Sequence, residues 1–271
     1  MPARDQLPPK EVTYKKKYVG SVEYFTSRAW YGDASLVAYT FKCLVPEKTG
    51  PDFVLVHGIG VSARSYGPTA VELAQHGDVH LIDLAGYGRA PRPARDLTIG
   101  DHALLVGRYL EEQNLDHPVV VGHSMGTQVV AELAASFPDQ LDHIVLIAPV
   151  IAPEARSLPK VAGLLFANGL KEPPLVAAEA VYDYLFRSGV PYMIQQTPHL
   201  LQADLDAIAE RVDAKTLVIC GLDDPIVPLA WGEQLAGRFR HGWFATVPGP
   251  HATMFAAPAA IAGLIDEHAH R

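Results

Sequence analysis

A serine, two adjacent aspartates and a histidine each stand in a short loop-like segment that follows an apolar run. Ser124 lies in Gly122-His-Ser-Met-Gly126, which fits the G-x-S-x-G pattern of a nucleophilic serine at a strand-to-helix turn. Asp223, Asp224 and His251 lie further along the chain. A serine hydroxyl is a weak nucleophile near neutral pH, so it needs a histidine base and a carboxylate that orients the histidine. These residue types together indicate acyl transfer.

The segments on either side of Ser124 support this interpretation. Val119-Val-Val121 predicts a short buried strand, and the spacing of apolar residues after Met125 predicts an amphipathic helix that ends before Pro138. Glycines at 122 and 126 are explained by a turn in which strand, loop and helix approach closely. The first N–H groups and the positive dipole end of the helix would point at the serine. An oxyanion would form at that place.

The acid and base candidates follow the two last predicted strands. The run Thr216–Cys220 ends before the loop with Asp223 and Asp224, and the run Trp243–Val247 ends before the loop with His251. Sites in parallel sheets form at the carboxyl ends of the strands. We therefore expect the serine, one aspartate and the histidine to meet at one edge of a sheet.

Strand-like and helix-like patterns alternate along much of the chain. The earlier predicted strands are residues 18–25, 36–45, 53–56, 79–84, 119–121 and 144–148, the first two forming an antiparallel pair. Helical spacing is found in residues 71–75 and 102–110 and again near 229–238 and 261–268. This order predicts an α/β fold with a mostly parallel central sheet and helices on both faces.

The alternation is lost between residues 150 and 212, which are rich in proline and contain helical pieces at 175–186 and 203–212. A structureless loop of that length is improbable in a compact domain, so we expect a small helical cap inserted after the sixth strand. Residues 18–149 and 213–271 would form the core, and residues 1–17 a flexible lead-in. Apolar cap residues either line a pocket for an acyl or alkyl group or pack the cap onto the core. They are Leu164, Leu165, Phe166, Tyr182, Leu185, Phe186, Tyr192 and Met193.

These motifs, in this order, resemble the serine esterase and lipase-like members of the α/β-hydrolase superfamily, with a G-H-S-M-G elbow and a helical cap. The resemblance begins near Phe53, extends to the last helix and is interrupted by the cap. It implies that the acid of a G-x-x-D loop is Asp224, with Asp223 as the neighbouring alternative. It also implies that the oxyanion is held by the backbone N–H groups of Met125 and Ile59. Two histidines, His57 and His123, are expected to support the scaffold without a catalytic role.

The resemblance implies a serine hydrolase that cleaves a carboxylic ester through an acyl-enzyme, without a cofactor or a metal ion. The catalytic residues would be Ser124, Asp224 and His251, since Ser, Asp, His is the chain order in this fold. Haloalkane dehalogenases and epoxide hydrolases of the superfamily have an aspartate at the elbow, so the serine argues against them. A thioesterase, lactonase, amidase or carbon–carbon bond hydrolase stays open. So does a receptor that binds a ligand without turnover.

Composition limits the partners. With 271 residues, a net charge of −8 and 19% charged residues, the chain is expected to be globular and not to bind nucleic acid or anionic membranes. Its expected partner is a small-molecule substrate with an apolar acyl or alkyl part. No apolar run is long enough to span a membrane. Cys43 and Cys220, both in predicted strands, are expected to be reduced, which favours a cytoplasmic location.

Overall fold

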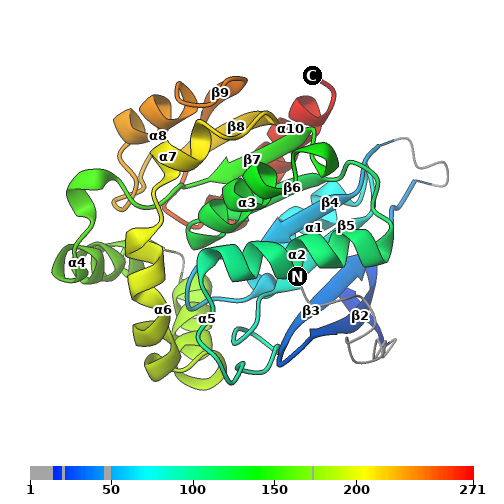
Figure 1. The fold of residues 1–271 in the computed structure, drawn as a ribbon, viewed down its shortest axis with the longest axis horizontal. Coiled ribbons are helices and arrows are strands. Elements are labelled where there is room, and N and C mark those ends of the chain that lie inside the picture. Colours follow the sequence, from blue (N-terminus) through cyan, green and yellow to red (C-terminus); the bar gives the residue numbers. More distant parts are fainter. Residues whose placement is uncertain (1–14, 20–21, 46–49, 173) are drawn as a thin grey trace.

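A nine-stranded sheet forms the centre of the described part of the molecule (Figure 1). The computed structural model describes residues 15–19, 22–45, 50–172 and 174–271. The strand order is β1-β2-β3-β5-β4-β6-β7-β8-β9; the β1–β2, β2–β3 and β3–β5 pairs are antiparallel and all the others parallel. The strands are β1 (Lys15–Val19), β2 (Val22–Tyr31), β3 (Ala34–Phe41), β4 (Phe53–Val56), β5 (Val79–Asp83), β6 (Val119–His123), β7 (His143–Ile147), β8 (Lys215–Gly221) and β9 (Gly242–Val247).

Helices cover both faces of the sheet, as the alternation of patterns predicts. In Figure 1, α2 and α3 lie in front of the strands, and α1 and α10 lie behind them. The helices are α1 (Gly67–Leu73), α2 (Ile99–Gln113), α3 (Met125–Ser136), α4 (Leu158–Gly169), α5 (Pro174–Tyr182), α6 (Val190–Gln202), α7 (Leu205–Ala209), α8 (Leu229–Ala236), α9 (Thr253–Ala256) and α10 (Pro258–Ala269). The short turns are η2 (Ala63–Tyr66), η3 (Pro138–Gln140), η4 (Pro153–Ala155) and η5 (Asp183–Arg187). The predicted α/β fold is confirmed.

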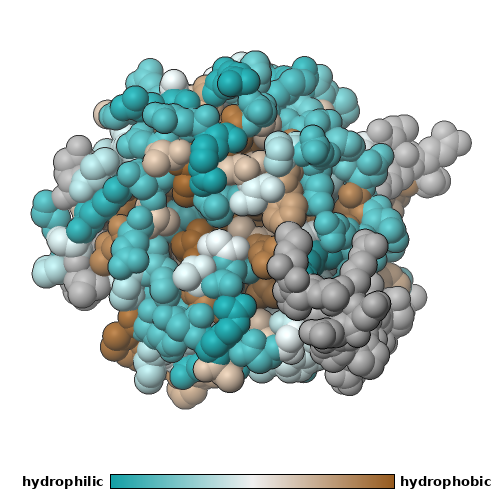
Figure 2. All heavy atoms as spheres, viewed as in Figure 1, coloured by the Kyte–Doolittle hydropathy of each residue, from teal (hydrophilic) through white to brown (hydrophobic). Residues whose placement is uncertain are grey.

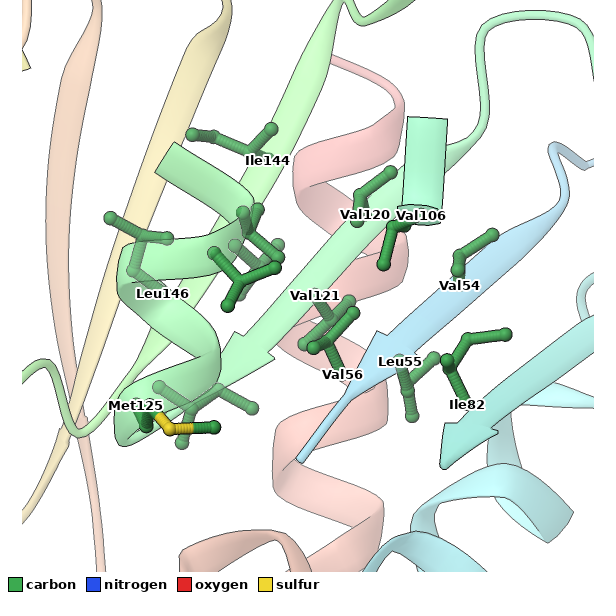
Figure 3. Close-up of a cluster of buried hydrophobic side chains, with 14 of the residues drawn as sticks. Val54, Leu55, Val56, Ile82, Val106, Val120, Val121, Met125, Ile144 and Leu146 are labelled. Carbon is green, nitrogen blue, oxygen red and sulfur yellow. The ribbon is translucent and has the colours of Figure 1, made fainter. Parts of the chain in front are cut away.

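The middle strands are continuous apolar runs because the sheet is covered on both sides. Every residue of β4 and β6 is buried. In Figure 3, Val54 and Val56 of β4 lie beside Val120 and Val121 of β6, with α3 in front and another helix behind. This packed centre fixes the carboxyl ends of β4 and β6, from which the loops with Ile59 and Ser124 emerge.

The N-terminal strands differ from the prediction. The predicted strand 18–25 is not a single strand: residues 18–19 lie in β1 and residues 22–25 in β2, and the two strands pair antiparallel. Residues 15–17, assigned to a flexible lead-in, form part of β1, whereas residues 1–14 lie outside the described residues. The additional strand places the helical insertion after the seventh strand, not the sixth. Cys43 lies two residues beyond the end of β3, and Cys220 lies in β8; both are free thiols.

Residues 150–212, which we call the insertion, contain α4 to α7 between β7 and β8. The predicted helix at 175–186 is α5 followed by the π-helical turn η5. The predicted helix at 203–212 is the shorter α7, and α4 and α6 were not predicted.

Within the described residues, no helix combines the length and the apolar composition needed to cross a bilayer. Figure 2 shows a face of the molecule that is mostly hydrophilic, with scattered hydrophobic residues.

Candidate active site

Ser124 lies between β6 and α3 in a backbone conformation that few residues other than glycine adopt. Its φ is 53° and its ψ is −119°. A Cβ at Gly122 would lie 2.8 Å from the backbone nitrogen of Thr127, and a Cβ at Gly126 would lie 2.8 Å from the carbonyl oxygen of His57. The two glycines are therefore required by the close approach of strand, turn and helix. The strained position is held by the packing around it, as is typical of functional sites.

Asp224 and His251 form a buried pair at the ends of β8 and β9. The Nδ1 atom of His251 lies 2.8 Å from Oδ2 of Asp224, and the side chain of Asp224 is completely buried. The other carboxylate oxygen accepts the backbone N–H groups of Ile226 and Val227 at 2.7 and 3.2 Å. Burial raises the pKa of Asp224, but the His251 imidazole and these N–H donors outweigh burial and hold the pKa below its ordinary value. The carboxylate is thus ionised and fixed in place.

The neighbouring carboxylate, Asp223, does not take part in this pair. Its side chain is exposed, and its backbone N–H donates to the carbonyl oxygen of Gly249 at 3.0 Å. This bond ties the loop after β8 to the loop after β9. Of the two alternatives that the sequence left open, the structure brings Asp224 to His251.

Ser124 and His251 line one cavity of about 80 Å³. The loop after β4 contributes Gly58 and Ile59 to its wall, and a Cβ at Gly58 would lie 2.9 Å from the Cβ of Ser124. Tyr184 of the insertion lies at the same cavity. The residues predicted from three separate loops are therefore brought together with one open space between them.

Ile59 and Met125, the residues expected to bind an oxyanion, come from two different elements next to Ser124. Ile59 lines the cavity next to Ser124. Met125 is the first residue of α3, and the first N–H groups of a helix have no intrahelical acceptor. The positive end of the α3 dipole is directed toward Ser124. Whether the Ile59 and Met125 N–H groups bind an oxyanion stays a prediction.

Two further buried histidines support the loops. The Nε2 atom of His57 accepts the N–H of Leu84 at 3.1 Å, so its proton lies on Nδ1, which donates to the carbonyl oxygen of Gly58 at 2.7 Å. The Nε2 atom of His123 donates to the carbonyl oxygen of His251 at 3.0 Å. Burial lowers the pKa of His57 and lowers that of His123 to about 3. Both rings are therefore neutral, and both form hydrogen bonds to backbone groups of neighbouring loops, in line with a scaffold role.

The insertion supplies two polar side chains that no sequence motif indicates. Oδ1 of Asn168 accepts the N–H of His251 at 3.3 Å, and Oε1 of Glu172 accepts the N–H of Ala252 at 2.9 Å. The Asn168 amide donates to the same Glu172 oxygen at 3.0 Å. The second Glu172 oxygen is buried and has no hydrogen-bond partner among the described residues. No motif marks these positions, because the contacts join residues about eighty positions apart.

The apolar residues of the insertion have mixed surroundings. Tyr182, Leu185 and Phe186 are largely exposed, with exposed fractions of 42%, 55% and 72%. Tyr192 is fully buried, and its hydroxyl donates to the carbonyl oxygen of Ala85 at 2.9 Å, which attaches α6 to the core. Leu164 lines a small cavity of about 20 Å³ beside Ser124. The side chains of Leu165 and Phe166 lie outside the described part of the structure.

Residues 53–264 match the protein family described as the alpha/beta hydrolase family. A protein of Mycobacterium phage D29, named provisionally as a non-heme haloperoxidase, is 29% identical over 247 residues, which cover 80% of this chain and 87% of that protein. The enol-lactonase from Burkholderia xenovorans LB400 has a TM-score of 0.76 at 19% identity, over 90% of this chain and 100% of its own. A thermophilic esterase from Thermogutta terrifontis has a TM-score of 0.73 at 19% identity, and the match covers 96% of this chain and 97% of the esterase. At such identities the structural likeness concerns the fold.

Proposed function

Because the chain belongs to the alpha/beta hydrolase family, we propose that it is a serine hydrolase that cleaves a carboxylic ester through an acyl-enzyme. The observation that carries this proposal is the buried His251–Asp224 pair, which opens together with Ser124 onto one cavity. Such a pair supplies the base and the orienting acid that a serine nucleophile needs.

In the first half of the reaction, the Oγ atom of Ser124 attacks the acyl carbon and its proton passes to Nε2 of His251. Asp224 accepts the Nδ1–H of His251, which fixes the tautomer and stabilises the imidazolium. The negative charge on the acyl oxygen is bound by the N–H groups of Ile59 and Met125, and each such donor typically contributes about 10²–10³ in turnover. His251 then returns the proton to the leaving alcohol.

In the second half, a water molecule replaces the alcohol. His251 takes a proton from this water, and the hydroxide equivalent attacks the acyl carbon of the acyl-enzyme. The same two N–H groups bind the oxyanion, and His251 gives its proton back to Oγ of Ser124 as the acid leaves. No cofactor takes part in this scheme.

The walls of the site favour a small apolar acyl group. Beside Ser124, the cavity of about 20 Å³ is lined on its other sides by aliphatic residues only, namely Ile59, Val150, Ile151, Leu164, Leu200 and Ile226. Four of these come from the insertion, which we therefore propose to act as a cap over the nucleophile. A lactone is a cyclic ester, so the structural similarity to an enol-lactonase is compatible with the same chemistry.

The proposal is tested by labelling with a fluorophosphonate probe and by hydrolysis of 4-nitrophenyl acetate and butyrate. Ser124→Ala should abolish labelling and lower kcat by about 10⁶. Ser136→Ala, at the exposed end of the same helix, is the matched control and should leave both unchanged. A parent protein that binds these esters without releasing product would instead identify a receptor. Turnover that survives in Ser124→Ala would remove the hydrolase proposal.

A further inference from the structure

A cavity of about 360 Å³ lies apart from Ser124, on the face of β2, β3 and β5 that α1 covers. Its apolar wall is formed by Tyr24, Tyr39, Phe41, Leu81, Pro68 and Phe255. Tyr24 stacks on Phe41 with ring centres 4.9 Å apart. This volume falls in the range of small-molecule sites, and the wall is mostly aromatic. The cavity suits a flat apolar body.

The charged lining of this cavity is dominated by arginine. Arg64 is neutralised by Asp183, with 2.8 Å between Nη2 and Oδ1. Arg89 and Arg187 also line the cavity, and neither forms an ion pair with a carboxylate in the part of the chain that the structure describes. Both side chains are exposed. In a chain with a net charge of −8, this leaves two guanidinium groups available to a ligand at one cavity.

The one carboxylate that lines the cavity is already occupied. Asp83 is buried and accepts the Tyr39 hydroxyl at 2.7 Å and the N–H groups of Ala63 and Arg89 at 2.8 Å each. These neutral donors stabilise the negative charge of Asp83 and hold the loops around it. Against this one negative charge stand the two arginines that have no carboxylate partner within the described ranges. The hydroxyl of Ser62 likewise donates to Asp183 at 2.5 Å. Among the charged side chains of the lining, Arg89 and Arg187 are therefore the two left to recognise an anionic ligand atom.

We propose that this cavity binds a small organic anion, namely a carboxylate carried on an aromatic or alicyclic ring. The ring lies against Tyr39 and Phe41, and the carboxylate pairs with Arg89 and Arg187, whose planar guanidinium groups match its two oxygens. Phe255 and the Asp183–Arg64 ion pair stand between this site and the cavity at Ser124. The ligand is therefore bound independently of the nucleophile, and the proposal does not rest on hydrolysis.

The test is calorimetric titration of the full-length chain with 2-naphthoate, and with 2-naphthamide as a neutral analogue of the same shape. The Ser124→Ala protein is used alongside the parent, so that chemistry at the serine plays no part. We expect saturable one-to-one binding of 2-naphthoate in both proteins. Arg89→Gln and Arg187→Gln should each weaken it by about tenfold or more, because each removes a charge-assisted hydrogen bond. 2-Naphthamide should bind the parent protein no more tightly than 2-naphthoate binds these two variants.

Two further variants separate this site from surface binding. Arg240→Gln removes an exposed arginine that pairs with Asp213 away from the cavity, and it should bind 2-naphthoate as the parent does. Gly67 lines the cavity, and a Cβ there would meet no atom within 4 Å, so a side chain added by Gly67→Phe starts in open space and is meant to place its ring in the cavity. It should abolish binding while the circular dichroism spectrum stays unchanged. Absence of saturable binding, equal affinity for the amide, or loss in Arg240→Gln equal to that in Arg187→Gln would overturn the proposal.

Discussion

The ends of the sheet strands and the insertion are built in different ways. Ser124, Asp224 and His251 stand on short loops whose backbone groups are bonded to one another and to buried strands. The insertion is attached mainly by individual side chains, among them Tyr192 and Asp183. It also carries most of the exposed large hydrophobic residues of the described chain, namely Leu170, Val181, Tyr182, Leu185, Phe186, Val190 and Ile194.

This difference separates two tasks. The strand ends hold Asp224 and His251 within hydrogen-bond distance of each other, which requires backbone that cannot shift. The insertion contributes Val150, Ile151, Leu164 and Leu200 to the small cavity beside Ser124. We expect its sequence to tolerate change, because few of its residues are constrained by the sheet. We therefore expect substitutions at strand ends to cost much more than comparable substitutions in the insertion, except where an insertion residue bonds to a catalytic loop.

After the loss expected for Ser124→Ala, the largest effect is expected at the acid. Asp224→Asn should lower kcat for 4-nitrophenyl butyrate by about 10⁴, because an amide cannot hold His251 in the tautomer that accepts the serine proton. Asp223→Asn is the matched control one residue away, and it should change kcat less than about threefold, since its side chain is exposed. Steady-state kinetics with 4-nitrophenyl butyrate measures kcat for both variants. Equal losses in the two variants would show that the buried pair is not the acid and base of the reaction.

A glycine at the elbow should matter more for stability than a glycine in the insertion. Gly122→Ala places a Cβ 2.8 Å from the Thr127 nitrogen and should lower the free energy of unfolding by about 3 kcal/mol. Gly163→Ala in α4 meets no atom within 4 Å and should raise it by about 0.5–1 kcal/mol, because alanine favours a helix. Urea unfolding measures both. If both substitutions raised the free energy of unfolding, or both lowered it, the contrast between the loop of Ser124 and the insertion would be wrong.

Acid should lower the stability of the whole fold through His102, which lies where α2 contacts the insertion. This buried ring on α2 donates from Nε2 to the Gln196 side chain of α6, and burial lowers its pKa from 6.5 to about 4. The unfolded chain therefore binds a proton below pH 6.5 that the folded chain does not bind until about pH 4. Stability is fully present above 6.5 and falls with pH, by about 2 kcal/mol from this residue between pH 7 and pH 5.

The corresponding measurement is urea unfolding at pH 7 and at pH 5. In His102→Gln, the difference between the two pH values should shrink by that amount, whatever the variant's stability at pH 7. His241→Gln changes an exposed histidine and should keep the parent's difference. If His102→Gln loses as much stability on acidification as the parent, the ring is not kept neutral by burial.

The same contrast explains how much could be predicted from the sequence. Strands such as β4, β6 and β8 are buried on both faces, so they appear as continuous apolar runs, and the loops that follow them could be located within a residue or two. The edge strand β1 was missed because it begins with three lysines. Lysine is common on edge strands, where pairing on one side replaces burial.

In the insertion, local patterns are weaker guides. The helix α6 contains Pro198, which argues against a helix in the sequence, and the tertiary contacts of Tyr192 and Gln196 compensate for it. Asn168 and Glu172 stand near the end of an apolar helix with no motif around them. Their role depends on a loop about eighty residues further along, which local periodicity cannot encode.

The smallest effect tests the place where the two regions meet, at Glu172. Glu172→Ala leaves the Ala252 N–H and the Asn168 amide without their acceptor, so the loop of His251 loses part of its support. We expect kcat to fall by about tenfold, the cost of one to two hydrogen bonds, with little change in KM. Glu172→Gln retains an oxygen that accepts both bonds and should recover most of the activity. Glu210→Ala, on an exposed part of the insertion, should have no effect. If Glu172→Gln is as impaired as Glu172→Ala, the carboxylate acts by its charge in the cavity and not by holding the loop.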